Sequence, residues 1–111
     1  MSDHVLCRLD EISDGGSAGF EIETGAGPLA LMAIRRASAV FVYVNVCPHW
    51  GAPLDLTPGR FLDASRTHIQ CATHGALFRI HDGRCIKGPC LGASLAPVRC
   101  RLEDGRVIAQ A

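Results

Sequence analysis

Two pairs of cysteine and histidine stand out in the sequence, because both side chains bind transition metals. Cys47 and His49 are separated by one residue, Cys71 and His74 by two residues, and residues 50–70 lie between the pairs. A glycine follows each pair closely. Each pair comes at the end of a segment that is typical of a strand, so we expect it on a loop at a strand tip. The pattern therefore predicts two loops that each offer one thiolate and one imidazole.

Three kinds of site can be weighed against this pattern. A structural zinc site takes four Cys or His ligands, but a single-residue spacer between Cys and His is unusual there. A nucleophilic site uses one Cys and one His, which leaves the duplicated pair unexplained. A two-iron cluster explains the duplication if one iron binds both cysteines and the other both histidines, because each loop then gives one ligand to each iron. The residues favour this cluster and leave zinc as the alternative.

Three of the remaining four cysteines are expected to serve the scaffold, and the role of the fourth, Cys90, stays open at this point. Cys7 and Cys100 alternate with apolar neighbours and Cys85 lies in a predicted hairpin, so we expect all three to be buried thiols. Cys90 lies in a loop. The chain does not start with a basic segment followed by an apolar one, so we identify no secretory signal and expect a cytoplasmic location, where disulfides are rare.

Composition narrows the possible functions. The chain has 111 residues, of which 48% are hydrophobic and 20% charged, which is typical of a folded domain and too apolar for intrinsic disorder. Eleven Lys and Arg balance eleven Asp and Glu, so there is no basic surplus for nucleic acid or an anionic membrane. The longest apolar runs, 29–34 and 39–44, are too short to span a bilayer. We therefore expect a single domain over 1–111, with neither nucleic acid nor membrane as a partner.

Turn signals predict an all-β fold. Short segments between Gly, Pro and Asp-Gly turns carry β-branched or aromatic residues at alternate positions, as in 41–46 and 98–102. The Asp-Gly pairs at 82–83 and 104–105 each lie between two such segments and predict tight hairpins. No stretch of helical length keeps an apolar period of about 3.6 residues. We expect about eight to ten short antiparallel strands in a sandwich or barrel.

The segment 46–107 resembles the cluster-binding half of the Rieske [2Fe-2S] family. That family carries a C-x-H box and then a C-x-x-H box, each close to a glycine, and a proline-containing third loop follows. The resemblance implies one [2Fe-2S] cluster per chain, with Cys47 and Cys71 on the inner iron and His49 and His74 on the outer iron. It also implies a Rieske-like antiparallel β-sandwich or barrel with a small cluster-binding subdomain of two hairpin loops.

The same resemblance assigns further residues to the surroundings of the cluster. The cluster-binding part would span roughly 46–92, and Cys90, in the third loop, would lie near the cluster without binding iron. The residues expected to surround the cluster are Trp50, Gly51, Gly75, Ala76, Phe78 and Pro89. The segment 50–70 between the boxes is somewhat longer than is common in the family, which affects that loop and not the ligands.

Four positions indicate which kind of Rieske protein the chain resembles. High-potential members have a disulfide between the boxes and Ser and Tyr hydroxyls near the cluster. Here Ala52 and Thr73 stand at the disulfide positions, and Ala76 and Phe78 stand where the hydroxyls would be. The resemblance therefore implies a low-potential, soluble ferredoxin.

The implied function is electron transfer without bond chemistry, so we do not expect an enzyme. The chain would be a one-electron carrier from a flavin- and NAD(P)H-dependent reductase to a terminal oxygenase. The small Rieske subunit of an assimilatory nitrite reductase is the alternative with the same chemistry. A zinc-bearing β domain that serves as an interaction module is the alternative from a different class.

Overall fold

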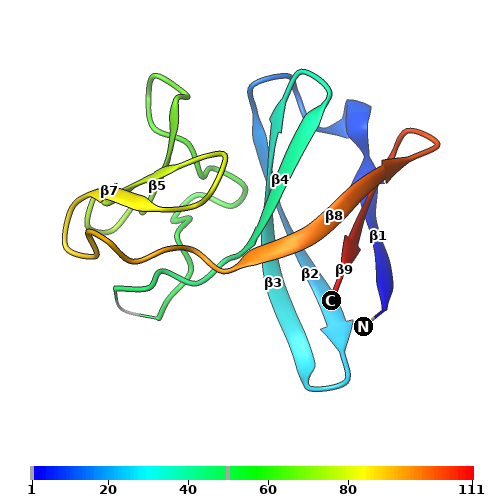
Figure 1. Cartoon of the computed structure of the whole chain (residues 1–111), viewed down its shortest axis with the longest axis horizontal. Helices are drawn as coiled ribbons and strands as arrows, with labels where there is room; N and C mark the ends of the chain where they lie inside the picture. Colours follow the sequence, from blue (N-terminus) through cyan, green and yellow to red (C-terminus); the bar gives the residue numbers. More distant parts are fainter. Residues whose placement is uncertain (1, 50) are drawn as a thin grey trace.

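The computed structural model describes every residue except 1 and 50, and its strands form two antiparallel sheets. The larger sheet has the order β1-β9-β8-β4-β3-β2 and curls into a nearly closed barrel, and the smaller sheet, β5-β6-β7, lies beside it (Figure 1). This architecture confirms the predicted all-β fold. The elements are β1 (Asp3–Arg8), a 3-10 turn η1 (Leu9–Glu11), β2 (Ser17–Thr24), β3 (Gly27–Arg36), β4 (Ala39–Val44), β5 (His68–Gln70), β6 (Leu77–Arg79), β7 (Cys85–Lys87), β8 (Pro97–Glu103) and β9 (Arg106–Gln110).

Strand β3 separates the two hydrophobic cores. Leu31 and Ala33 pack into the core of the barrel, whereas Met32 and Ile34 pack into a second core that also contains the buried residues of the small sheet. Successive side chains of a strand point to opposite faces, so a strand with a core on each side must be apolar at every position. This is why 29–34 is a continuous apolar run and does not alternate.

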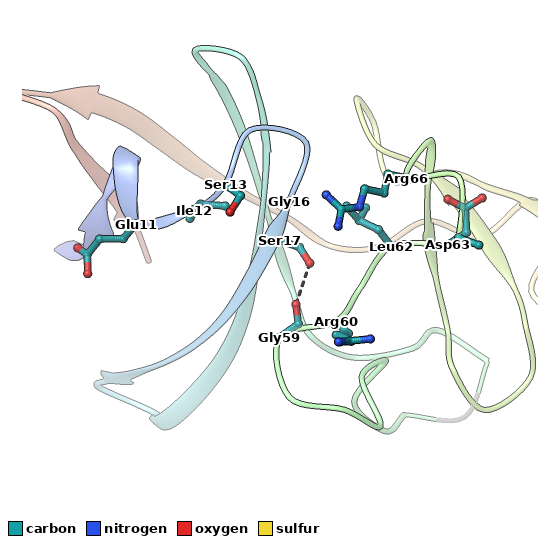
Figure 2. A pocket seen from close by; sticks show the side chains of 11 residues that line it. Glu11, Ile12, Ser13, Gly16, Ser17, Gly59, Arg60, Leu62, Asp63 and Arg66 are labelled. Atoms are coloured by element: carbon teal, nitrogen blue, oxygen red, sulfur yellow. Dashed lines mark hydrogen bonds between the residues drawn. The ribbon is translucent and has the colours of Figure 1, made fainter.

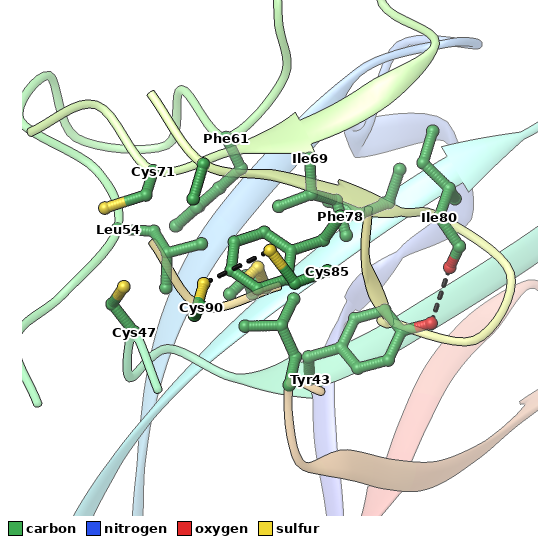
Figure 3. Close-up of a cluster of buried hydrophobic side chains, with 14 residues drawn as sticks. Tyr43, Cys47, Leu54, Phe61, Ile69, Cys71, Phe78, Ile80, Cys85 and Cys90 are labelled. Atoms are coloured by element: carbon green, nitrogen blue, oxygen red, sulfur yellow. Dashed lines mark hydrogen bonds between the residues drawn. The ribbon is translucent and has the colours of Figure 1, made fainter. Parts of the chain in front are cut away.

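Tyr43 links the barrel to the small sheet. Its side chain, 2% exposed, extends from β4, and its hydroxyl donates a hydrogen bond to the carbonyl of Ile80 (Figure 3). Burial raises the pKa of Tyr43 to about 12, so the hydroxyl remains a protonated donor. A Cβ on Gly83 would lie 2.7 Å from this ring, and the φ of Gly83 is +75°, so only glycine fits at this point of the hairpin.

The two predicted hairpins are both present. β6 and β7 pair around the turn at 82–83, and β8 and β9 pair around the turn at 104–105. No helix in the described part of the chain has the length and apolar content needed to cross a membrane.

Two of the three cysteines predicted to be buried differ from the prediction. Cys85 is buried as predicted, but Cys7 and Cys100 are only half-buried on β1 and β8. His4, on β1, is not fully exposed. β1 pairs with β9 along its length, which half-buries the His4 ring opposite Ala109 and leaves its Nε2 atom without a hydrogen-bond partner among the described residues.

Candidate metal centre

The two boxes have the same backbone structure. The N–H of Cys47 donates a hydrogen bond to the carbonyl of Ala52 at 2.8 Å, and the N–H of Cys71 donates to the carbonyl of Ala76 at 2.9 Å. In both boxes the acceptor is thus five residues after the cysteine. Two segments with different spacers therefore form equivalent loops, which explains why one Cys and one His occur in each.

A glycine closes each loop at the equivalent position. The N–H groups of Gly51 and Gly75 donate to the carbonyls of Cys47 and Cys71, both at 2.8 Å, and the two glycines have φ values of +76° and +71°. A Cβ at either position would meet nothing within 4 Å, so crowding is not the reason for glycine. The left-handed backbone is the reason, because a residue with a Cβ is strained there.

The loops separate the thiols from the imidazoles. Cys47 and Cys71 are both fully buried and lie at the same end of the second core, on either side of Leu54 (Figure 3). His49 and His74 are exposed, and their ring centroids are 4.8 Å apart at an angle of 84°. The structure therefore places the two predicted sulfur atoms on the inside and brings the two predicted rings together at the surface.

Leu54 connects the two boxes through its backbone. Its N–H donates to the side-chain Oδ1 of Asn45 at 2.8 Å, and its carbonyl accepts a hydrogen bond from the N–H of Ala72 at 2.9 Å. Asn45 directly follows β4, and Ala72 directly follows Cys71. The spacing between the two candidate metal-binding loops is therefore fixed through Asn45.

Asn45 belongs to a larger polar network that the sequence did not reveal. It is the one buried polar residue in the described part of the chain, and its Nδ2 donates to Oδ1 of Asp55 at 2.9 Å. The other oxygen of Asp55 accepts the N–H of Gly59 at 3.0 Å, and the carbonyl of Gly59 accepts the hydroxyl of Ser17 at 2.8 Å. A buried polar group costs free energy unless it is paired, so each of these bonds constrains the loop between the boxes.

The third loop packs against the second box. A Cβ on Gly88 would lie 2.9 Å from the Cα of Ala76, so the close approach of the two segments requires glycine at position 88. Pro89 is exposed, whereas Cys90 is buried and its thiol lies 3.2 Å from that of Cys85. Burial and the hydrogen bond to Cys85 raise the pKa of Cys90 to about 12, so its sulfur stays protonated. The structure thus keeps Cys90 beside the site as a neutral thiol.

Phe78 and Trp50 were also predicted to lie near the cluster. Phe78, on β6, is fully buried, and its ring points toward the end of the core where Cys47 and Cys71 lie (Figure 3). Trp50, which the resemblance places beside His49, lies outside the described residues.

The four side chains fit the donor set of a mixed-ligand two-iron cluster. Two buried thiols suit iron bridged by sulfide, and two imidazoles at the surface suit the second iron. In the residues that the structure describes, no three His, Cys, Asp or Glu side chains gather in a way that could hold one ion.

One cavity lies away from the two boxes. It has a volume of about 460 Å³ and opens between the end of η1, the start of β2 and residues 59–66, where the Ser17–Gly59 hydrogen bond crosses between the barrel and the inter-box loop (Figure 2). Arg60 and Arg66 line it. None of its lining residues belongs to either box, so the cavity reflects the longer segment between the boxes and not the metal centre.

One family model matches most of the chain, and solved structures share its fold. The sequence model of the Rieske [2Fe-2S] domain matches residues 2–107, and no curated protein matches the chain. The ferredoxin of carbazole 1,9a-dioxygenase from Nocardioides aromaticivorans IC177 superposes with a TM-score of 0.78 at 19% identity, covering 98% of this chain and 97% of that one. The Sphingomonas yanoikuyae B1 ferredoxin has a TM-score of 0.77 at 28% identity, covering 99% and 100%. A chain from the complex of reduced oxygenase and oxidized ferredoxin in carbazole 1,9a-dioxygenase has a TM-score of 0.71 at 21% identity, covering 96% and 91%.

Proposed function

Because the chain belongs to the Rieske [2Fe-2S] domain family, we propose that it is a ferredoxin that carries single electrons from a reductase to a terminal oxygenase. The observation that carries this proposal is the pair of equivalent loops with buried thiols and exposed imidazoles. The likeness to whole ferredoxins supports it, because the chain covers nearly their full length.

We propose Cys47 and Cys71 as ligands of the inner iron and His49 and His74 as ligands of the outer iron. The bound cluster would supply a reversible one-electron step. Two thiolates and two neutral imidazoles balance two ferric ions and two sulfides, whereas four thiolates would leave a net negative charge that opposes reduction. The protein contributes by keeping both thiols away from water and both rings at the surface.

The surroundings of the cluster favour a potential at the low end of the Rieske range. Hydrogen bonds to the cluster sulfurs raise the potential, because they stabilise the more negative reduced form. Ala76 and Phe78, both fully buried beside the second box, have no hydroxyl to donate. Ala52 and Thr73 cannot form a disulfide between the boxes. We therefore propose that the ferredoxin serves an acceptor of low potential.

The exposed rings define where a partner would dock. His49 and His74 lie at the surface, and apolar side chains next to the site are also exposed, with Val46 at 43% and Leu91 at 69%. A small apolar patch around two imidazoles suits a brief complex of the kind that electron carriers form. The structure of an oxygenase in complex with its ferredoxin in the carbazole system supports an oxygenase as the partner.

Metal analysis tests the proposal first. Protein purified without oxygen should contain two iron and two acid-labile sulfide per chain and should show an EPR signal only after reduction. Cys47→Ser or Cys71→Ser should abolish the visible absorption, whereas Cys100→Ser, on the barrel, should keep it. One zinc and no sulfide would overturn the assignment and favour the interaction module.

A transfer assay tests the docking surface. Leu91→Asp should slow reduction of the loaded protein by an NADH-dependent flavoprotein reductase of a Rieske oxygenase system, with the midpoint potential unchanged. Leu102→Asp is the matched control, because Leu102 is also exposed, at 41%, but lies on β8 away from the boxes. Equal rates for the two variants would show that transfer does not use the surface around His49 and His74.

A further inference from the structure

Cys85 and Cys90 form a close thiol pair that the proposed iron site does not use. Their Sγ atoms are 3.2 Å apart, and the Cys90 thiol donates to Cys85 (Figure 3). The Cys85 thiol donates to the carbonyl of Lys87 at 3.3 Å. The side chains are 1% and 7% exposed. Neither residue is one of the four cysteine and histidine residues of the boxes.

The backbone holds the two cysteines in this position. The N–H of Cys85 donates to the carbonyl of Ala93 at 2.8 Å, and the N–H of Ala93 donates to the carbonyl of Cys90 at 2.9 Å. A third hydrogen bond joins the N–H of Gly92 to the carbonyl of Cys85 at 3.3 Å. The contact is therefore built into the segment that follows β7 and does not depend on the side-chain rotamers alone.

Cys90 is the anchor of the third loop. Among residues 88–92 it alone is buried, and the other four are exposed. Gly88 packs directly on Ala76, which closes the second box. A bond between Cys90 and Cys85 would therefore hold the third loop in place beside the second box of the proposed cluster site.

We propose that Cys85 and Cys90 are a modification site, a dithiol that converts to an intramolecular disulfide and thereby clamps the third loop onto β7. The oxidant class is a low-molecular-weight disulfide such as oxidised glutathione. One protein thiol attacks it and releases one glutathione thiol, and the second protein thiol then displaces the other glutathione. Two hydrogen atoms leave the protein, one S–S bond forms in it, and the S–S bond of the oxidant is reduced to two thiols.

The distance favours the second step of this exchange. A disulfide has an S–S length of about 2.05 Å, so the sulfur atoms at 3.2 Å need to approach by only about 1 Å. Two thiols held in contact react as an intramolecular pair, which disfavours a lasting mixed disulfide with glutathione. Cys7 and Cys100 lack such a neighbour in one another, because Cys7 pairs with Val107 on one side of β9 and Cys100 pairs with Ala109 on the other.

Burial controls the first step. Both sulfur atoms are shielded from the oxidant, so the 88–92 loop must open before exchange begins. Gly88 and Gly92 have φ values of +104° and +90° and flank the loop. We therefore expect a slow conversion of the folded protein that goes to completion at a single pair.

Intact mass and peptide mapping test the proposal. Loaded protein is incubated with excess oxidised glutathione, quenched with N-ethylmaleimide under denaturing conditions and digested with trypsin. Cleavage after Arg84, Lys87 and Arg99 places the two cysteines in separate peptides, 85–87 and 88–99. We expect the chain to lose two hydrogen atoms and two alkylated thiols, and these two peptides to appear joined.

Variants and a second readout identify the pair and its effect. Cys85→Ser and Cys90→Ser should each abolish the joined peptides, and Cys100→Ser should retain them. Amide hydrogen exchange at Leu91 and Gly92 should slow after oxidation, because the clamped loop opens less often. Full retention of both thiols, glutathione left on one cysteine, or unchanged exchange in the oxidised protein would overturn the proposal. The visible absorption of the same sample reports the cluster separately, so a failure of the proposed function is distinguishable.

Discussion

A reciprocal exchange of Asn45 and Asp55 tests whether this polar pair holds the two candidate metal-binding loops together. Asn45→Asp keeps the acceptor for the N–H of Leu54 but places a second carboxylate where the amide Nδ2 stood, 2.9 Å from an oxygen of Asp55. Asp55→Asn leaves one N–H group facing either the amide of Asn45 or the N–H of Gly59. Each single change therefore breaks one hydrogen bond and sets like groups against each other.

The magnitude follows from the bond that is lost. A hydrogen bond to a charged group contributes about 1.5 to 3 kcal/mol, and Asn45 is nearly buried, so solvent replaces it poorly. Carboxylate repulsion adds to this cost in Asn45→Asp, although uptake of a proton limits it. We expect each single variant to lose about 2 to 4 kcal/mol. The double variant restores every donor and acceptor with the roles reversed and should recover about 2 kcal/mol relative to additivity.

The assay is the rate at which loaded protein loses its visible absorption in urea, because cluster loss makes unfolding irreversible. A change of about 1.4 kcal/mol in the barrier is tenfold in rate, so the single variants should bleach at least about tenfold faster than the parent, and the double variant should bleach more slowly than either. The exposed pair Asp3 and Gln110, joined at 3.2 Å, is the matched control, and Asp3→Asn should change little. Purely additive effects in the double variant would refute the reasoning.

Two further predictions concern the cluster surroundings and the scaffold. Ala76→Ser and Phe78→Tyr should each raise the midpoint potential by roughly 40 mV, measured by protein-film voltammetry. About 1 kcal/mol of preference for the reduced state corresponds to about 40 mV per electron. An unchanged or lowered potential in the loaded double variant would contradict the placement of these residues. His4→Leu should slow the loss of visible absorption in urea, because it removes a buried nitrogen that has no partner among the described residues. The substitution should stabilise the fold by about 1 kcal/mol. Faster loss of absorption would show that the ring makes a needed contact.

The features that could be predicted from the sequence depend on residues that are close together along the chain. The two Asp-Gly hairpins depend on adjacent residues, and the alternating segments 41–46 and 98–102 predict most of β4 and β8 without any tertiary information. The two boxes could be recognised for the same reason. In each loop a backbone hydrogen bond joins the N–H of Cys47 or Cys71 to a carbonyl only five residues further along the chain.

The features that escaped prediction depend on partners far along the chain. Asn45 interrupts an apolar segment, which is a sign of a buried polar role, but its contact with Asp55 and the link through Leu54 to the second box exist only once the loops fold together. His4 lies near the chain start, where exposure is the usual expectation, yet pairing of β1 with β9 half-buries it. The thiol contact between Cys85 and Cys90 likewise requires the chain to turn back after β7.

Pulsed EPR of the reduced protein tests the central claim most directly, because it reports which atoms bind the iron. Protein labelled with ¹⁵N only in histidine should show couplings from two histidine nitrogens, and these should be absent from the spectrum of a four-thiolate cluster. Couplings to two labelled nitrogens would support Cys47, Cys71, His49 and His74 as the ligand set. A reduced cluster without nitrogen coupling, or a protein that contains zinc and no sulfide, would contradict it.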